Sequence, residues 1–164
     1  MADPSFPFHH ESTGQANAPV EQVFAFLDDP TALAAHMGES SMMMLGSRMS
    51  INVGAGGGRL IGSKVRMEGR VLGIRLSLEE VITKRQVPAM KVWETLEAPK
   101  RLVTSRYRKG FELTRNAVSS LVRVAIDCAL PINAPGSWLG ALLGAAYARW
   151  CTKQMVIGAA RHFS

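Results

Sequence analysis

The apolar C-terminal stretch Trp138–Phe163 constrains the fold of this chain more than any other segment. It follows Pro131 and Pro135 and contains no proline of its own. Its apolar residues recur at about 100° per residue, which predicts one long helix. Because apolar or small residues occur on both sides of this helix, we expect a sheet to hold it. Leu142, Ala146 and Trp150 are expected to fill the concavity of the sheet. They belong to the side that consists of Leu139, Leu142, Leu143, Ala146, Trp150 and Ile157. The other side consists of Ala141, Gly144, Ala148, Cys151, Met155 and Ala159.

The length of 164 residues predicts a single domain that spans residues 1–164. A chain of this size can build one core and enclose an internal cavity. Apolar residues make up 47% of the chain and charged residues 20%, which is typical of a globular protein and excludes a disordered one.

Basic charge is concentrated in the second part of the chain. Residues 1–58 contain one basic and six acidic residues, whereas residues 59–164 contain eighteen basic and seven acidic ones. A basic body can attract anionic ligands, lipid headgroups or nucleic acid. However, Lys64, Arg66 and Arg70 alternate with less polar residues, as on the solvated face of a strand. No aromatic residues are interleaved with these bases for base stacking, so we expect no nucleic-acid partner, and contact with a membrane surface is not favoured.

The cysteines and the N-terminus indicate a cytoplasmic location. Cys128 and Cys151 both lie among apolar residues, so we expect buried free thiols. The first five residues have neither the basic nor the apolar region of a signal peptide. The apolar run Ala134–Ala148 is shorter than the roughly 18–20 residues that a membrane span requires.

Two short helices are predicted near the N-terminus, after a first strand at Phe8–Asn17. Pro19 stands where a proline of the first helical turn is expected, and apolar residues follow at helical spacing until Asp28. Pro30 ends that helix, and the segment Thr31–Met37 predicts a second one.

The middle of the chain predicts an antiparallel meander. Ser40–Val53 is expected to be a strand, and the glycine-rich segment Gly54–Gly58 a hairpin connection. That segment has neither G-x-G-x-x-G spacing nor the residue order of a Walker motif, and a strand rather than a helix follows it. From residue 63 to Leu130, alternating apolar residues with short links predict consecutive antiparallel strands.

Four short segments carry a family resemblance: Ala18–Phe24, Gly62–Gly69, Pro88 with Trp93–Thr95, and Tyr147–Cys151. They resemble the START-like, or SRPBCC, superfamily, and its bacterial polyketide cyclase/dehydrase-like branch in particular. The resemblance covers nearly the whole chain and includes no catalytic signature. It implies an α+β helix-grip fold, in which a curved antiparallel sheet of about six to seven strands wraps around a long C-terminal helix, with two short helices after the first strand and a cavity between sheet and helix.

The resemblance implies that a small hydrophobic molecule binds in the cavity, such as a lipid, an isoprenoid or an aromatic, polyketide-like compound. A cyclase/dehydrase-like enzyme with a cavity acid or base, and a protein-interaction module, are the alternatives, and a homodimer stays open. No cofactor is implied. The residues expected to line the cavity are Met67, Leu76, Met90, Val92, Val103, Ser105, Tyr107, Val124, Leu142, Ala146 and Trp150.

Glu94 and Tyr107 are the candidate catalytic residues. Simple alternation places Glu94 on the face of its strand that carries Met90 and Val92, where burial would raise the pKa of its carboxyl group. Such a group could act as acid or base. The alternative is that Trp93 faces inward and Glu94 outward. Tyr107 is either a hydroxyl donor in the cavity or a core tyrosine whose hydroxyl has a partner.

The histidines indicate no metal site. His9 and His10 are adjacent and therefore point to opposite faces of a strand, while His36 and His162 are isolated in the sequence. No Cys/His pair has the spacing of metal ligands, and no G-x-S-x-G nucleophile elbow is present. We therefore expect no metal site and no nucleophile elbow, while a Ser-His-Asp constellation assembled from distant parts of the chain stays open.

Overall fold

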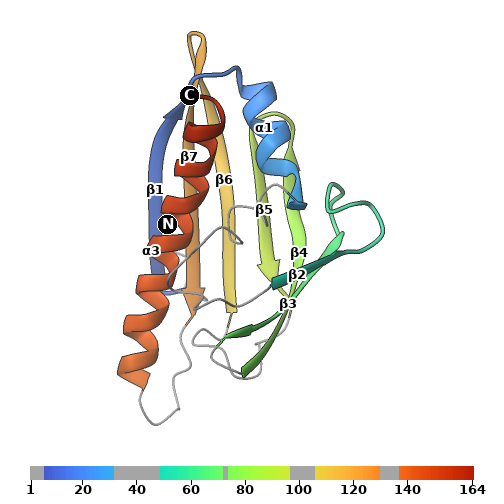
Figure 1. The fold of residues 1–164 in the computed structure, drawn as a ribbon, viewed down its shortest axis with the longest axis vertical. Helices are drawn as coiled ribbons and strands as arrows, with labels where there is room; N and C mark the ends of the chain where they lie inside the picture. The colour runs from blue at the N-terminus through green and yellow to red at the C-terminus, as the bar shows by residue number, and fades with distance from the viewer. Residues whose placement is uncertain (1–5, 32–48, 72–73, 97–105, 130–136) are drawn as a thin grey trace.

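A computed structural model of the chain describes residues 6–31, 49–71, 74–96, 106–129 and 137–164 (Figure 1). Two helices and seven strands lie within these ranges. In chain order they are β1 (Phe8–Ala16), α1 (Val20–Asp28), β2 (Met49–Val53), β3 (Lys64–Val71), β4 (Ile74–Gln86), β5 (Met90–Thr95), β6 (Arg106–Asn116), β7 (Ser119–Ala129) and α3 (Ser137–His162).

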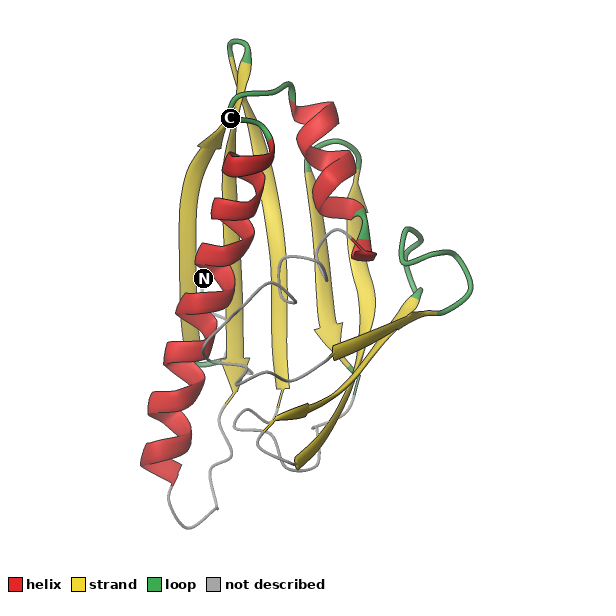
Figure 2. Ribbon diagram, in the orientation of Figure 1, coloured by secondary structure: helices red, strands yellow, loops and turns green. Residues whose placement is uncertain are grey.

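The seven strands form one antiparallel sheet in the order β1-β7-β6-β5-β4-β3-β2. Figure 2 shows both helices on the same side of this sheet, with α3 running along β1 and β7. The predicted α+β helix-grip architecture is confirmed, including the number of strands and the long C-terminal helix.

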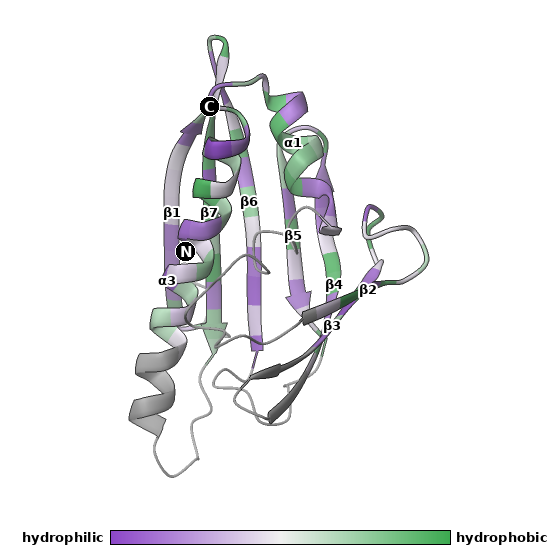
Figure 3. Ribbon diagram, viewed as in Figure 1, coloured by the Kyte–Doolittle hydropathy of each residue, from purple (hydrophilic) through white to green (hydrophobic). Residues whose placement is uncertain are grey.

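Helix α1 forms as its apolar spacing predicts. Its residues Val23, Phe24 and Leu27 are buried, and Pro19 occupies the N-cap position. Figure 3 shows the apolar character of α1 and of much of β7. The predicted second helix Thr31–Met37 lies outside the described residues apart from Thr31, and only Met49–Val53 of the predicted strand from Ser40 is described.

The glycine-rich segment is the connection between β2 and β3, as predicted. Gly56, Gly57 and Gly58 have φ values of 91°, 61° and 68°, the left-handed region that favours glycine. A strand follows, so the segment presents no helix N-terminus to a phosphate.

The orientation of α3 differs from the sequence-based expectation. The side that carries Ala148, Cys151 and Ala159 is buried against the sheet, whereas Ile157 is 38% exposed and Trp150 is only half-buried. The cause is the close approach of α3 to β1. A Cβ atom at Gly14 would lie 2.3 Å from Val156 Cγ1, so only small or slim side chains fit between the helix and this strand.

The core consists of two adjoining clusters on the helix-covered face of the sheet. The larger cluster joins α1 to β5, β6, β7 and the C-terminal half of α3, with Trp93 and Phe111 at its centre. The smaller cluster lies toward the N-terminal half of α3 and includes both cysteines, Cys128 and Cys151, which are buried free thiols. None of the described helices is long and apolar enough to cross a bilayer.

Candidate functional site

A buried polar cluster lies on the inner face of the sheet, opposite α3. It consists of Glu80 on β4 and of Tyr107 and Lys109 on β6. The Tyr107 hydroxyl donates a hydrogen bond to Glu80 Oε1, and Lys109 Nζ lies 3.0 Å from the same oxygen. Tyr107 and Lys109 are two residues apart on one strand and therefore share a face. One carboxylate oxygen thus holds both a phenol and an ammonium group.

Strand register brings these residues together. Thr95 on β5 pairs with Glu80 on one side, and its hydroxyl contacts the backbone of Tyr107 on the other. The Thr95 Oγ1 atom accepts a hydrogen bond of 3.0 Å from Tyr107 N and donates one of 3.3 Å to Tyr107 O. The side chain of Thr95 thereby fixes Tyr107 where β5 ends.

Burial and the Glu80 carboxylate set the protonation of the cluster. Burial raises the pKa of Tyr107 well above its usual value, and the charge of Glu80 raises it further, so the hydroxyl keeps its proton. For Lys109, burial lowers the pKa, but the attraction of Glu80 outweighs it and the net pKa is raised. Burial also raises the pKa of the Cys151 thiol. At neutral pH the cluster therefore holds a phenol, a thiol and an ammonium group.

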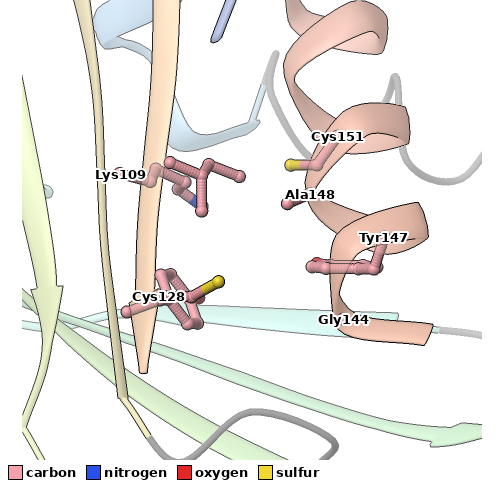
Figure 4. A pocket seen from close by; sticks show the side chains of 8 residues that line it. Lys109, Cys128, Gly144, Tyr147, Ala148 and Cys151 are labelled. Carbon is pink, nitrogen blue, oxygen red and sulfur yellow. The ribbon is translucent and has the colours of Figure 1, made fainter. Parts of the chain in front are cut away.

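A small cavity lies beside this cluster, between the sheet and α3 (Figure 4). Figure 4 shows Lys109 and Cys128 extending from the sheet toward Tyr147, Ala148 and Cys151 on the helix. The cavity volume is about 10 Å³, which is roughly the room of one water molecule. The lining residues are Tyr107, Lys109, Ile126, Cys128, Gly144, Tyr147, Ala148 and Cys151.

Lys109 has unused hydrogen-bonding capacity at this cavity. An ammonium group carries three donors, and within the described residues Glu80 is the only acceptor that Lys109 Nζ contacts. The side chain is only 8% exposed, so bulk water does not readily replace the missing acceptors. Besides Glu80, the ammonium group lies over the rings of Trp93 and Tyr107, 5.6 and 5.9 Å from their centroids, and its side chain lines the cavity, where an acceptor atom can reach it.

In a second buried lysine, Lys91, all three donors of the ammonium group are hydrogen-bonded. Its Nζ donates to Asp28 Oδ1 at 2.6 Å, to Gly58 O at 2.7 Å and to Asp28 O at 3.0 Å, and its exposure is 0%. Arg85 Nη2 adds a bond of 2.8 Å to Asp28 Oδ2. This network joins α1, β4, β5 and the β2–β3 loop. It lines no described cavity, so its role is to hold these elements together.

The structure corrects the placement of Glu94, Met90 and Val92. All three lie on the outer face of β5, because Lys91, Trp93 and Thr95 are its buried, inward-facing residues. Glu94 Oε1 accepts a hydrogen bond of 2.9 Å from Arg108 Nε. Glu94 is therefore not an acid of the cavity, and the alternative with Trp93 inward is the observed one. Met90 and Val92 instead line a hollow of about 230 Å³ on the outer face, with Arg108, Arg123 and other residues of β6 and β7.

The remaining predicted residues are only partly brought together. Tyr107 lines the cavity, and Met67 and Val124 are buried on the same face of the sheet but do not line it. Ala146 and Trp150 are half-buried on α3 and do not line the cavity either. Val103 and Ser105, and the side chains of Leu76 and Leu142, lie outside the described part of the structure.

Sequence reasoning missed Glu80, Lys109 and the cysteines as site residues. For Lys109 a signal was present, because alternation from Tyr107 places Lys109 and then Phe111 on the same face. No comparable signal existed for Glu80, which is 27 residues away from Tyr107 along the chain. Only the strand register, with Thr95 between them, places the carboxylate beside the phenol.

Comparison with known proteins finds similarity in structure alone. A scan against protein-family models and a search of curated proteins find no match. Among solved structures, the Zhui aromatase/cyclase from Streptomyces sp. R1128 superposes with a TM-score of 0.72 at 14% sequence identity, over 94% of this chain and 92% of that one. The chain has the START-like fold.

Two further structures with this fold support the same conclusion. A START superfamily protein from Mycobacterium smegmatis has a TM-score of 0.62 at 14% identity, over 95% of this chain and 99% of that one. Major latex-like protein 151 from Panax ginseng has a TM-score of 0.59 at 12% identity, over 95% and 97%. The helix-grip fold that the START-like resemblance implied is thus confirmed in three dimensions. At these identities the similarity establishes the fold and leaves the ligand open.

Proposed function

We propose that this START-like protein binds a small, largely apolar molecule between the sheet and α3 and holds an oxygen atom of that molecule with Lys109. The observation that carries the proposal is the incomplete hydrogen bonding of a buried, charged Lys109 at a cavity. Ile126, Ala148 and Cys151 in the cavity wall offer dispersion contacts, and the two lining tyrosines, Tyr107 and Tyr147, combine an aromatic ring with a hydroxyl group.

The charge of the cluster selects a neutral oxygen. Glu80 already balances the charge of Lys109, so a carboxylate ligand would add an uncompensated negative charge to a buried site. A ketone or alcohol oxygen can accept from Lys109 without that penalty. We therefore expect ligands headed by a carbonyl or hydroxyl group to bind more tightly than acids of the same size.

The cavity must widen to admit such a molecule. Tyr147 is 40% exposed, and its ring projects from α3 toward the sheet in Figure 4. Rotation of this side chain opens the cavity without disturbing the Glu80–Lys109 pair. Tyr147 is accordingly the lining residue that we expect to move on binding.

Native mass spectrometry with four matched compounds tests this function. We expect uptake of acetophenone and phenylethanol, and at least about tenfold weaker uptake of benzoate and ethylbenzene. The Ala148→Leu substitution fills the cavity and should abolish uptake, whereas Ala146→Leu, on the same helix but away from the cavity, should not. Equal uptake by both variants, or a preference for benzoate, would contradict the proposal.

The Tyr107–Glu80 hydrogen bond favours cyclase/dehydrase-like chemistry as a second candidate. If the Tyr107 hydroxyl turns from Glu80 to a ketone oxygen held by Lys109, the freed Glu80 carboxylate can accept the α-proton. The electron pair of the broken C–H bond then moves onto the carbonyl oxygen, where Lys109 and Tyr107 stabilise the enolate, the first step of carbon–carbon bond formation at an α-carbon. Protein-dependent exchange of the α-protons of acetophenone in heavy water, followed by NMR, tests this candidate. Tyr107→Phe should slow the exchange at least about tenfold without abolishing binding. Exchange no faster than in buffer would leave the binding function alone.

A further inference from the structure

The β2–β3 loop presents two large apolar side chains to solvent. Leu60 is 62% exposed and Ile61 is 64% exposed. We call this adjacent pair the apolar tip. Figure 1 shows the loop that carries it projecting away from the sheet, well clear of α3.

Backbone hydrogen bonds hold the loop in this shape. Arg59 N donates to Gly56 O at 3.0 Å, and Ser63 N donates to Leu60 O at 3.0 Å. At the end of the loop, Gly62 N donates to Ile82 O at 2.8 Å, which ties the loop to β4. The apolar tip is therefore held outward by an ordered backbone.

Unpaired basic residues accompany the apolar tip. Arg59 precedes it directly, and the exposed Lys84 lies two residues beyond Ile82, where the loop joins β4. Among the described residues neither Arg59 nor Lys84 makes an ion pair, whereas nearby Lys64 pairs with Glu79. No acidic residue occurs between residues 52 and 67. This edge of the molecule thus combines exposed apolar area with two exposed cations that no described carboxylate pairs.

We propose that the apolar tip docks the protein on an anionic lipid membrane, with Leu60 and Ile61 entering the interface and Arg59 and Lys84 contacting the headgroups. The shape and size of the apolar tip favour a membrane over a protein partner. A stable protein interface buries about 800 Å² on each partner, far more than two side chains supply. A lipid surface accepts a narrow, protruding apolar group, and each nearby cation strengthens the binding about fivefold. This surface is separate from the cavity and does not depend on the proposed ligand.

Vesicle co-sedimentation of the full chain tests the proposal. We expect association with vesicles that contain phosphatidylserine, weaker association with pure phosphatidylcholine, and a decrease with added salt. The double substitution Leu60→Ser/Ile61→Ser should weaken association with phosphatidylserine vesicles at least about tenfold. Arg59→Gln/Lys84→Gln should weaken it and remove most of the salt dependence.

Val118→Ser is the matched control, because Val118 is 86% exposed at the tip of the β6–β7 hairpin, away from the loop. This variant should bind vesicles as the unchanged protein does. Thermal melts of all variants should coincide, because the altered side chains are exposed. Absence of vesicle binding, or equal binding by the Leu60→Ser/Ile61→Ser variant, would overturn the proposal. Self-association that only this variant loses, without vesicle binding, would overturn it in favour of contact between chains.

Discussion

Lys109 Nζ and Glu80 Oε1 are 3.0 Å apart across the inner face of the sheet, and both side chains are almost fully buried. They come from β6 and β4, with β5 between them. A buried pair of this kind costs desolvation energy, which its mutual attraction offsets only while both partners are present. The pair is therefore sensitive to the loss of one member and tolerant to the loss of both.

Replacement of one member should destabilise the fold strongly. We expect Lys109→Met to lower the free energy of unfolding by about 3–5 kcal/mol, because Glu80 is then buried without a counter-ion. The double variant Lys109→Met/Glu80→Gln should recover most of that loss. Urea denaturation measures both values. A double variant as unstable as the single one would show that the two residues do not act as a pair.

Asp28 should make stability dependent on pH in the acid range. Burial raises the pKa of its carboxyl group, but hydrogen bonds from Arg85 and Lys91 outweigh it, so the folded-state pKa lies below 3.8. A group with a lowered folded-state pKa contributes stability above its unfolded pKa and loses it as the pH falls through the folded value. The free energy of unfolding should therefore decrease as the pH falls from about 5 to below 3.8.

The variant Asp28→Asn isolates this contribution. It should be less stable at neutral pH, because Lys91 stays buried without its carboxylate, and its stability should change less between about pH 5 and pH 3. Denaturation series at several pH values provide the comparison. Parallel pH curves for the two proteins would assign the acid sensitivity to other carboxylates.

The pKa values of the adjacent histidines, His9 and His10, should be shifted in opposite directions. A hydrogen bond to Asp127 raises the pKa of His9 above 6.5 and outweighs partial burial, while burial and the charge of Arg149 lower the pKa of His10. NMR titration of the imidazole protons measures both. Asp127→Asn should lower the pKa of His9 and leave that of His10 nearly unchanged. Two coincident titrations would contradict the opposite-face placement of these side chains.

The packing of helix α3 against β1 should depend on the absence of a side chain at Gly14. A Cβ atom there would lie 2.3 Å from Val156 Cγ1, so we expect Gly14→Ala to cost about 1–3 kcal/mol through overpacking. Val156→Ala should remove the clash, so the double variant should be more stable than the sum of the single effects predicts. Thermal or urea unfolding of the four proteins measures this coupling. Strict additivity would place the helix farther from β1.

Alternation and helical spacing predicted the elements of this fold but not which face each presents. On β5, Met90 and Val92 suggested the inner face, yet that face holds Lys91, whose partners Asp28 and Gly58 come from other elements. On α3, the small residues Ala148, Cys151 and Ala159 are buried, whereas Trp150 packs only partly buried against the smaller cluster, because strand and helix approach closely. Charges buried by long-range partners, and the distance between layers, are tertiary properties that a local pattern does not contain.

Tyr107 was predictable as an inward residue, whereas its function depends on neighbours that are distant in sequence. Glu80 and Cys151 reach it from β4 and α3. The same holds for the apolar tip, where exposure rather than composition distinguishes Leu60 and Ile61 from core residues. A sequence of alternating residues cannot by itself separate an apolar side chain held outward from one that is packed.

The most direct test of the proposed function is the carbon NMR signal of acetophenone labelled at its carbonyl group and bound to the protein. If Lys109 donates a hydrogen bond to this oxygen, the carbonyl signal should move downfield on binding, and Lys109→Met/Glu80→Gln should lose that movement while still binding the aromatic ring. Tyr107→Phe keeps the ion pair and should retain most of the shift. A bound ketone with an unshifted carbonyl signal, or one in contact with Met90 and Val92 on the outer face, would contradict the account.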